Sequence, residues 1–144
     1  MSEQAKESIV IKAPRERVHE VVLDFEQYPR WAADLKAVEV LERDDEGRGT
    51  KVAFRAAAFG RSTSYTLAYS YAELPEALSW VQVDGDVTRR LDGTYRFAPV
   101  DDGTEVTYEL EVELKIPLPG FIKSRAESRI VGSALRELKA RTES

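Results

Sequence analysis

The spacing of apolar and polar positions divides the chain into stretches with different periods. Over residues 15–25 the apolar side chains recur at spacings of three and four, which predicts an amphipathic helix. Over residues 35–114 apolar and polar residues alternate in short runs, which predicts strands with one apolar and one polar face. Over residues 121–141 a spacing of four returns and predicts a long final helix.

The segment before these strands is short and contains two prolines. Residues 8–11 predict a first strand, and Pro14 suits the first turn of the helix that follows. Residues 26–31, interrupted by Pro29, predict a second short helical turn. The apolar stripe of the first helix consists of Val18, Val21, Val22 and Phe25.

Six strands are predicted between residues 35 and 114. Their alternating apolar positions include Val38, Val40, Val52, Phe54, Tyr65, Leu67, Tyr69, Tyr71, Leu78, Leu91, Tyr95, Phe97, Val106, Tyr108, Leu110, Val112 and Leu114. Short glycine-containing turns, most of them acidic, are expected at 44–47, 59–61, 84–86 and 101–103, where Asp and Gly suit the backbone. Such short connections predict an antiparallel meander, because parallel strands need long crossovers.

The final helix is expected to cover the apolar face of this sheet. Its predicted stripe consists of Ile122, Ala126, Ile130, Ala134 and Leu138, and Gly132 also lies near its middle. A helix face with so many small residues, opposite a sheet face rich in tyrosine, predicts a void rather than a filled core. A largely apolar void with a few hydroxyls is typical of a small-molecule site.

Composition narrows the classes of function. The 144 residues suit one α+β domain over residues 1–144. The chain has no cysteine, one histidine and one methionine, which excludes thiolate chemistry, cysteine zinc sites and multi-histidine metal sites, so neither a metal nor a cofactor is expected.

Charge and hydropathy bear on location and partners. The net charge of −5 without a basic cluster disfavours binding of nucleic acid. The N-terminal residues do not have the pattern of a secretion signal, and no apolar run approaches the ~20 residues of a membrane span. We therefore expect a cytoplasmic protein without an integral membrane segment, and the sequence leaves open whether it forms a homodimer.

Two local motifs carry a family resemblance. Residues 11–18 read Ile-Lys-Ala-Pro-Arg-Glu-Arg-Val and are similar to an I-x-A-P-x-x-x-V entry to the first helix. Residues 24–31 read Asp-Phe-Glu-Gln-Tyr-Pro-Arg-Trp and are similar to a D-F-x-x-Y-P-x-W segment. With the order of elements, these motifs resemble the polyketide cyclase/dehydrase and lipid-transport family of the START-like (SRPBCC, helix-grip) superfamily, over essentially the whole chain.

The resemblance implies a fold and a range of functions. The fold is a seven-stranded curved antiparallel sheet wrapped around a long C-terminal helix, with a hydrophobic cavity between them. Members of the superfamily bind sterols, lipids, isoprenoid quinones, plant hormones or polyketide intermediates. Some cyclise or dehydrate what they bind, whereas many only carry or sense it.

The residues expected to contact a ligand lie on the inferred inward faces. They are Val52, Phe54, Tyr65, Leu67, Tyr69, Trp80, Gln82, Tyr95, Phe97, Tyr108, Leu110, Ile130 and Ala134. The tyrosines either fill the core, with each hydroxyl reaching the rim or a backbone partner, or present their hydroxyls to a ligand. Tyr28 and Trp31, in the short second helix, either plug one end of the fold or gate the cavity mouth.

Other assignments stay open or negative. Either Trp80 and Gln82 or Val81 and Val83 face inward from their strand. His19 lies off the stripe of its helix and is expected at the surface. The arginines fall mostly on polar strand faces, and no catalytic residue is assigned because no Ser-His-Asp set, P-loop or dinucleotide motif is present.

Three hypotheses from different classes follow. The first is a protein that binds or transports a small hydrophobic molecule without chemistry. The second is a polyketide cyclase/aromatase or dehydratase that would use tyrosine hydroxyls as donors and pocket shape to fold its substrate. The third is a protein-interaction module of the quinone-chaperone or ribosome-associated type, which a filled interior would favour.

Overall fold

The computed structural model describes residues 3–58 and 61–144. Its elements, in chain order, are β1 (Glu3–Ile11), α1 (Arg15–Leu23), η1 (Phe25–Gln27), α2 (Tyr28–Trp31), β2 (Leu35–Arg43), β3 (Gly49–Ala58), β4 (Arg61–Ser70), β5 (Ala77–Gly85), β6 (Thr88–Val100), β7 (Gly103–Leu114) and α3 (Gly120–Glu143). The turn expected at residues 59–61 includes residues 59 and 60, which lie outside the described residues.

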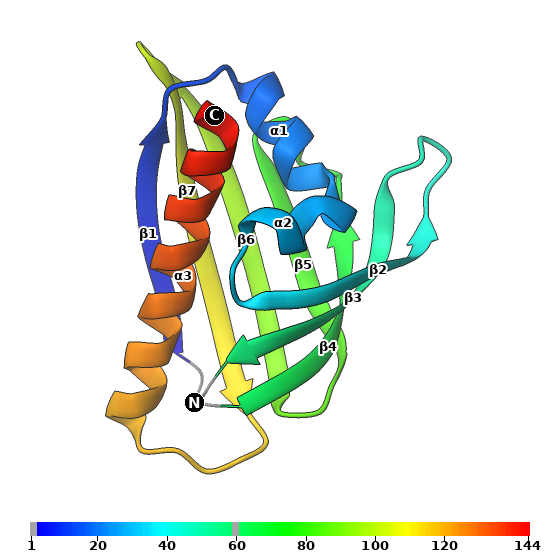
Figure 1. Ribbon diagram of the computed structural model, residues 1–144, viewed down its shortest axis with the longest axis vertical. Helices are drawn as coiled ribbons and strands as arrows, with labels where there is room; N and C mark the ends of the chain where they lie inside the picture. Colours follow the sequence, from blue (N-terminus) through cyan, green and yellow to red (C-terminus); the bar gives the residue numbers. More distant parts are fainter. Residues whose placement is uncertain (1–2, 59–60) are drawn as a thin grey trace.

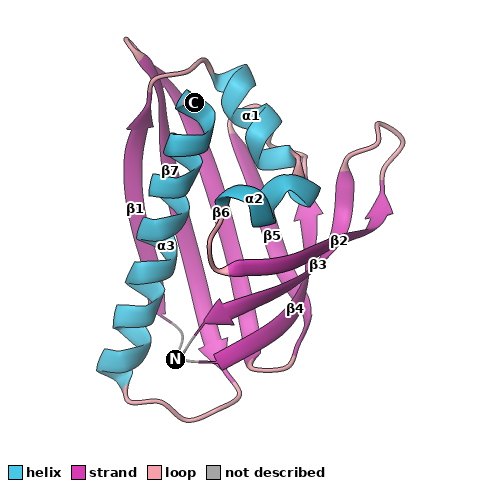
Figure 2. Ribbon diagram, viewed as in Figure 1, coloured by secondary structure: helices cyan, strands magenta, loops and turns pink. Residues whose placement is uncertain are grey.

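The strands form one antiparallel seven-stranded sheet in the order β1-β7-β6-β5-β4-β3-β2. The curved sheet carries all the helices on one side, with α3 lying along β1 and β7 and the short helices α1 and α2 beside it (Figures 1 and 2). The predicted helix-grip architecture, with a meander from β2 to β7 and two short helices after β1, is confirmed. None of the helices within the described ranges is long and apolar enough to cross a membrane.

The first strand is longer than predicted. It spans Glu3–Ile11 rather than residues 8–11, because its polar first half pairs with β7 from Val112 to Tyr108. Those residues show no apolar alternation, so only the hydrogen bonds offered by a neighbouring strand could reveal them. The predicted first helix also ends two residues early, at Leu23, and is followed by η1 and α2.

The buried stripe of α3 differs from the predicted one. The buried residues of this helix are Glu127, Val131, Gly132, Leu135, Leu138 and Thr142. Of the predicted stripe, Leu138 is buried and Ile130 and Ala134 are partly buried and face the sheet, whereas Ile122 is 42% exposed. A row at a constant spacing of four drifts around a helix of 3.6 residues per turn, so it cannot stay on one face over five turns. The observed contact follows mixed spacings of three and four instead.

One end of the space between the sheet and α3 is filled by aliphatic side chains, and we call it the packed end. Val18 and Val22 of α1, Val106 of β7 and Leu138 of α3 are buried there almost completely. Helix α1 contacts α3, β6 and β7, which closes this end.

The orientation of β5 is now resolved. Leu78 and Trp80 are buried, whereas Val81 and Val83 are 52% and 53% exposed on the opposite face. The Trp80 face of the strand therefore points toward the helices.

Candidate functional site: an aromatic cavity between the sheet and the C-terminal helix

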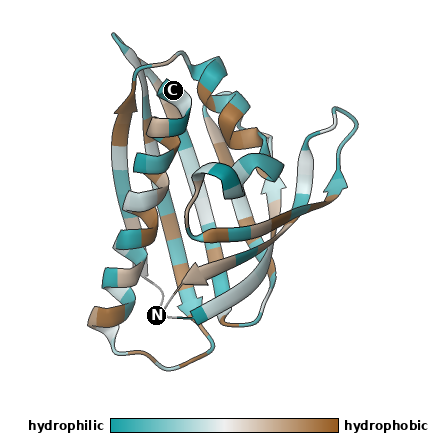
Figure 3. Cartoon of the chain, viewed as in Figure 1, coloured by the Kyte–Doolittle hydropathy of each residue, from teal (hydrophilic) through white to brown (hydrophobic). Residues whose placement is uncertain are grey.

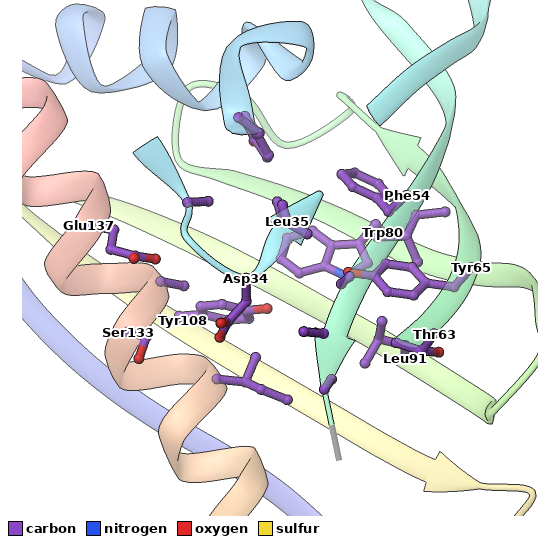
Figure 4. A pocket seen from close by; sticks show the side chains of 18 of the residues that line it. Asp34, Leu35, Phe54, Thr63, Tyr65, Trp80, Leu91, Tyr108, Ser133 and Glu137 are labelled. Carbon is purple, nitrogen blue, oxygen red and sulfur yellow. The ribbon is translucent and has the colours of Figure 1, made fainter. Parts of the chain in front are cut away.

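The other end of the same space contains a cavity of about 140 Å³. Its walls come from β3 to β7, from α2 and the start of β2, and from one side of α3. Figure 4 shows Trp80, Tyr65, Phe54 and Tyr108 around this space. An apolar cavity of about 150 Å³ in a protein interior is large enough to bind benzene, so this one suits a small ring system.

Most of the residues expected to contact a ligand line this cavity. They are Phe54, Tyr65, Leu67, Tyr69, Trp80, Tyr95, Tyr108, Ile130 and Ala134, together with Tyr28 and Trp31. Four others do not line it: Val52, Phe97 and Leu110 are buried in the core. The fourth, Gln82, hydrogen-bonds to Thr88, with its Nε2 donating to the carbonyl at 2.8 Å and its Oε1 accepting from the hydroxyl at 2.5 Å.

Aromatic rings in mutual contact form the main wall. The ring of Trp80 lies with its centroid 5.3 Å from that of Tyr95, 5.6 Å from that of Tyr108 and 5.7 Å from that of Tyr69. Phe54 and Tyr65 stack at 5.3 Å on the neighbouring strands. These tilted and edge-on contacts lie in the range preferred by aromatic pairs, so each ring holds the next in place.

A glycine on β6 permits the position of Trp80. Gly93 pairs with Trp80 across the β5–β6 ladder, and the indole lies over its backbone. A Cβ atom at residue 93 would lie 2.4 Å from Cζ2 of Trp80, which is closer than non-bonded carbons allow. Any larger residue at this position would push the indole toward the cavity.

Four tyrosine hydroxyls have no hydrogen-bond partner among the described residues. They belong to Tyr65, Tyr69, Tyr95 and Tyr108, all of which line the cavity. The described side chains include no fully enclosed polar atom without a partner. The four hydroxyls must therefore contact open space, where water or a bound molecule can receive their hydrogen bonds.

Burial raises the pKa of these phenols above the ordinary value. The pKa of Tyr65 is raised, and the pKa values of Tyr69, Tyr95 and Tyr108 are raised well above the ordinary value. The main cause is desolvation, which disfavours the phenolate. At neutral pH the four groups are hydrogen-bond donors and are poorly suited to give up a proton.

The partly exposed side of the lining at the start of β2 and on α3, which we call the mouth, carries charged residues that the sequence did not single out. Asp34, Ser133 and Glu137 lie together between the start of β2 and α3 (Figure 4). Glu137 ties the two segments together, because its Oε2 accepts a hydrogen bond from the backbone N–H of Ala33 at 3.1 Å. Both charged groups on the described lining are therefore acidic.

Several further residues contribute to the lining without having been predicted as ligand contacts. Ala56, Ala57 and Ala58 at the end of β3 line the cavity together with Thr63 and Leu91. The only sequence signal for the three alanines is that they occur in a run, which interrupts the alternation of large and polar residues in β3.

The two residues proposed as a gate differ in their surroundings. Tyr28 is buried, and its hydroxyl donates a short hydrogen bond to the carbonyl oxygen of Val22, which anchors it in the wall. Trp31 is only partly buried, contacts Tyr28 edge-on at 5.0 Å and lines the cavity. Of the two, Trp31 has the freer position, and its role as a gate stays a prediction.

Residue His19 is less exposed than expected. Its ring packs edge-on against that of Phe97, with the two ring centroids 4.6 Å apart. Its Nε2 lies 3.1 Å from the carbonyl oxygen of Pro75. Partial burial lowers the pKa of this imidazole below 6.5 despite the hydrogen bond to Pro75. Because these contacts lie outside the cavity lining, His19 takes no part in the candidate site.

Within the described ranges, no three His, Cys, Asp or Glu side chains gather closely enough to hold a metal ion. No arginine belongs to the cavity lining over those same residues. The chemistry offered by the site is thus a set of aromatic faces and hydroxyl donors with two carboxylates at the entrance.

Solved structures with the same fold were found across nearly the whole chain. A START superfamily protein from Mycobacterium smegmatis is 23% identical, with a TM-score of 0.90 and 97% of each chain covered. The Zhui aromatase/cyclase from Streptomyces sp. R1128 is 14% identical, with a TM-score of 0.86 and coverage of 99% of this chain and 94% of that one.

A third neighbour is the STAR-related lipid transfer protein (fragment 25–204) from Xanthomonas axonopodis, which is 20% identical with a TM-score of 0.76. The match covers 98% of this chain and 86% of the Xanthomonas axonopodis chain. At these identities the likeness establishes the fold. No curated protein matches the sequence.

The family model described as "Polyketide cyclase / dehydrase and lipid transport" matches residues 2–143. That span includes both motifs and every element from β1 to α3. The chain therefore belongs to the polyketide cyclase/dehydrase and lipid-transport family, within the START-like group of folds.

Proposed function

We propose that the protein binds a small, flat, uncharged aromatic molecule in the cavity and carries it without changing it. The observation that carries this proposal is the set of four tyrosine hydroxyls that contact open space within an aromatic wall. A molecule with an apolar ring body and one or two oxygen acceptors would satisfy the hydroxyls and exclude water from the rings.

The size and charge of the site narrow the class of ligand. A volume of about 140 Å³ suits one or two fused rings, with any longer tail leaving through the mouth. Asp34 and Glu137 at the entrance would repel a carboxylate such as a fatty acid. A neutral phenol or quinone therefore fits better than an anionic lipid.

A test uses 2-naphthol as the probe and isothermal titration calorimetry as the measurement. We expect saturable binding of one molecule per chain and a higher melting temperature in its presence. The probe 2-naphthoic acid, of similar size but negatively charged at neutral pH, is expected to bind at least about tenfold more weakly, because about 1.4 kcal/mol of repulsion corresponds to that factor.

A matched pair of variants assigns the binding to the cavity. Ala134→Phe places a ring into the space, whereas Ala140→Phe makes the same change at an exposed position of the same helix. The first is expected to abolish binding and the second to leave it intact. Equal binding by both variants would show that the probe binds elsewhere.

A polyketide cyclase or dehydratase is the second candidate, because the same hydroxyls could donate to the carbonyl groups of a folded poly-β-carbonyl chain. The raised pKa values of the phenols argue against them as acids, which is why the carrier is preferred. Incubation with an aromatic poly-β-ketone, followed by mass spectrometry, separates the two. A carrier returns the compound unchanged, a cyclase that only closes a ring returns an isomer of the same mass with a different retention time, and a dehydratase or aromatase returns it with the loss of water.

An interaction module of the third class would be expected to have a filled interior. The cavity supports the binding functions instead. A screen in which neither aromatic alcohols, quinones nor polyphenols bind would return the interaction module to first place.

A further inference from the structure

The beginning of α3 exposes large apolar side chains to solvent. Phe121 is 68% exposed and its neighbour Ile122 is 42% exposed. They follow the loop of residues 115–119, which contains Leu118 between two prolines. Figure 3 shows hydrophobic colour on the first turn of α3 and in the loop before it, at the end of the molecule remote from α1. Two adjacent exposed apolar side chains beside an apolar loop form a small patch, and a patch of this kind can mark an interaction site.

The same segment is basic in an acidic protein. Residues 115–129 carry a net charge of +3, whereas the whole chain carries −5. Two of the four cations are already engaged: Lys115 donates to the carbonyl oxygen of Gly85 at 2.6 Å, and Lys123 pairs with buried Glu127 at 2.9 Å. The other two, Arg125 and Arg129, are exposed and make no ion pair within the part of the chain that the structure describes.

The exposed apolar and cationic groups share one surface. Phe121, Arg125 and Arg129 are spaced by four residues, so they follow one another along one side of α3. We call Phe121, Ile122, Arg125 and Arg129 the α3 tip.

We propose that the α3 tip docks on the surface of a lipid bilayer that contains anionic lipids. Phe121 and Ile122 would enter the headgroup region, while Arg125 and Arg129 would bind lipid phosphates. Two exposed apolar side chains are too few for the roughly 800 Å² per partner of a stable protein interface. They suit shallow insertion, for which adjacent cations provide the complementary charge.

The α3 tip and part of the cavity lining lie on the same helix. Ile130, which lines the cavity, lies nine residues after Phe121 on the same helix, or about 14 Å along its axis. The mouth at Ser133 lies twelve residues after Phe121, or about 18 Å along the same axis, so a molecule that leaves the bilayer would have to cross that distance to enter the cavity. Docking itself does not depend on the proposed ligand, so it is measured without one.

Co-sedimentation of the full chain with vesicles tests the proposal. We expect binding to phosphatidylcholine vesicles with about 30 mol% phosphatidylserine, weakening as salt is raised and absent for phosphatidylcholine alone. Arg125→Gln/Arg129→Gln is expected to weaken binding about 30-fold, on the basis of about tenfold per 1.4 kcal/mol and about 1 kcal/mol for each cation. Phe121→Ser is expected to weaken it about tenfold.

Matched controls make the same changes elsewhere on the surface. Val81→Ser/Val83→Ser removes two exposed apolar side chains from the outer face of β5, and Arg30→Gln/Arg55→Gln removes two exposed cations without ion-pair partners among the described residues. Both controls are expected to bind as the unchanged chain does. Equal binding to neutral vesicles, equal losses in tip and control variants, or a dimer that dissociates on Phe121→Ser would each overturn the proposal.

Discussion

The two ends of the space between the sheet and α3 are built from neighbouring parts of the same strands and helix, yet one is filled and the other is not. At the packed end, branched aliphatic side chains such as Val18, Val106 and Leu138 are completely buried in the core. At the cavity end, flat rings from β4 to β7 face small residues, among them Ala56 and Ala134. Side-chain shape, rather than the path of the backbone, decides which end stays open.

The open end persists because its walls are rigid. Aliphatic side chains can change rotamer to fill a gap, whereas a ring held by its neighbours moves only if they move too. Trp80 contacts three other rings and lies over Gly93, so it cannot swing outward through β6. The four tyrosine hydroxyls also favour an open cavity. They have no hydrogen-bond partner in the part of the protein that the structure describes, so filling the space with apolar side chains would leave them without one.

Alkaline pH should act on the cavity end with the largest effect. The pKa values of Tyr65, Tyr69, Tyr95 and Tyr108 are raised by burial, so these phenols stay protonated in the folded chain where the unfolded chain ionises near pH 10. The unfolded state is therefore favoured as pH rises above about 10, by at most about 1.4 kcal/mol per tyrosine and pH unit. Denaturant unfolding at stepped pH, with tyrosinate absorbance, checks this; tyrosines that titrate near pH 10 before unfolding would contradict it.

A Leu→Ala substitution should lower the free energy of unfolding more at the packed end than at the cavity end. Leu138→Ala at the packed end leaves a new void among close-packed side chains and is expected to cost about 3–5 kcal/mol of unfolding free energy. Leu91→Ala enlarges a cavity that already exists and is expected to cost less, about 2–3 kcal/mol. Urea unfolding measures both, and equal costs would mean that the cavity end is packed as well as the other.

Substitution of Gly93 should disturb the cavity wall without touching the packed end. Gly93→Ala brings its Cβ into the indole of Trp80, and we expect a loss of about 1–3 kcal/mol of stability from overpacking. The displaced indole should also reduce 2-naphthol binding, while a Gly120→Ala control, whose Cβ would meet no atom within 4 Å, should leave binding unchanged. Unfolding curves and calorimetry check both effects, and normal binding by the Gly93 variant would contradict the assigned role of Trp80.

Removal of single tyrosine hydroxyls should give the smallest effects. At one site the loss should weaken ligand binding, and at the other it should lower stability. Tyr95→Phe removes a hydroxyl without a protein partner and is expected to leave stability nearly unchanged while weakening 2-naphthol binding by about 1 kcal/mol. Tyr28→Phe removes the hydrogen bond to the Val22 carbonyl and is expected to cost about 1–2 kcal/mol of stability. Thermal melts and titrations distinguish them; a stability loss in the Tyr95 variant would mean that its hydroxyl has a structural role.

The sequence predicted the fold well because alternation is a direct consequence of strand geometry. Inward-facing tyrosines and Trp80 were predicted from the same alternation, and most of them line the cavity. Gln82 also obeyed the alternation, but a sequence cannot reveal that Thr88 across the hairpin satisfies its amide. Asp34 and Glu137 were missed because they meet only when β2 and α3 come together, 103 residues apart in the chain.

The stripe of α3 illustrates a second limit. Its apolar residues are too sparse for the period alone to choose between Ile122 and Val131 as inward positions. The choice depends on the lengths of β1 and β7, against which the helix packs, and those lengths are set by pairing between distant segments. The α3 tip shows the same limit, since Phe121 and Ile122 are apolar and yet exposed.

Methyl resonances recorded during a titration with 2-naphthol test the contrast between the two ends most directly. We expect saturable shifts for the methyl groups around the cavity, which are those of Ala56, Ala58, Leu67 and Ala134. The methyl groups at the packed end, those of Val18, Val22, Val106 and Leu138, should not shift. Shifts of equal size at both ends, or shifts confined to surface methyl groups such as those of Val81 and Val83, would contradict it.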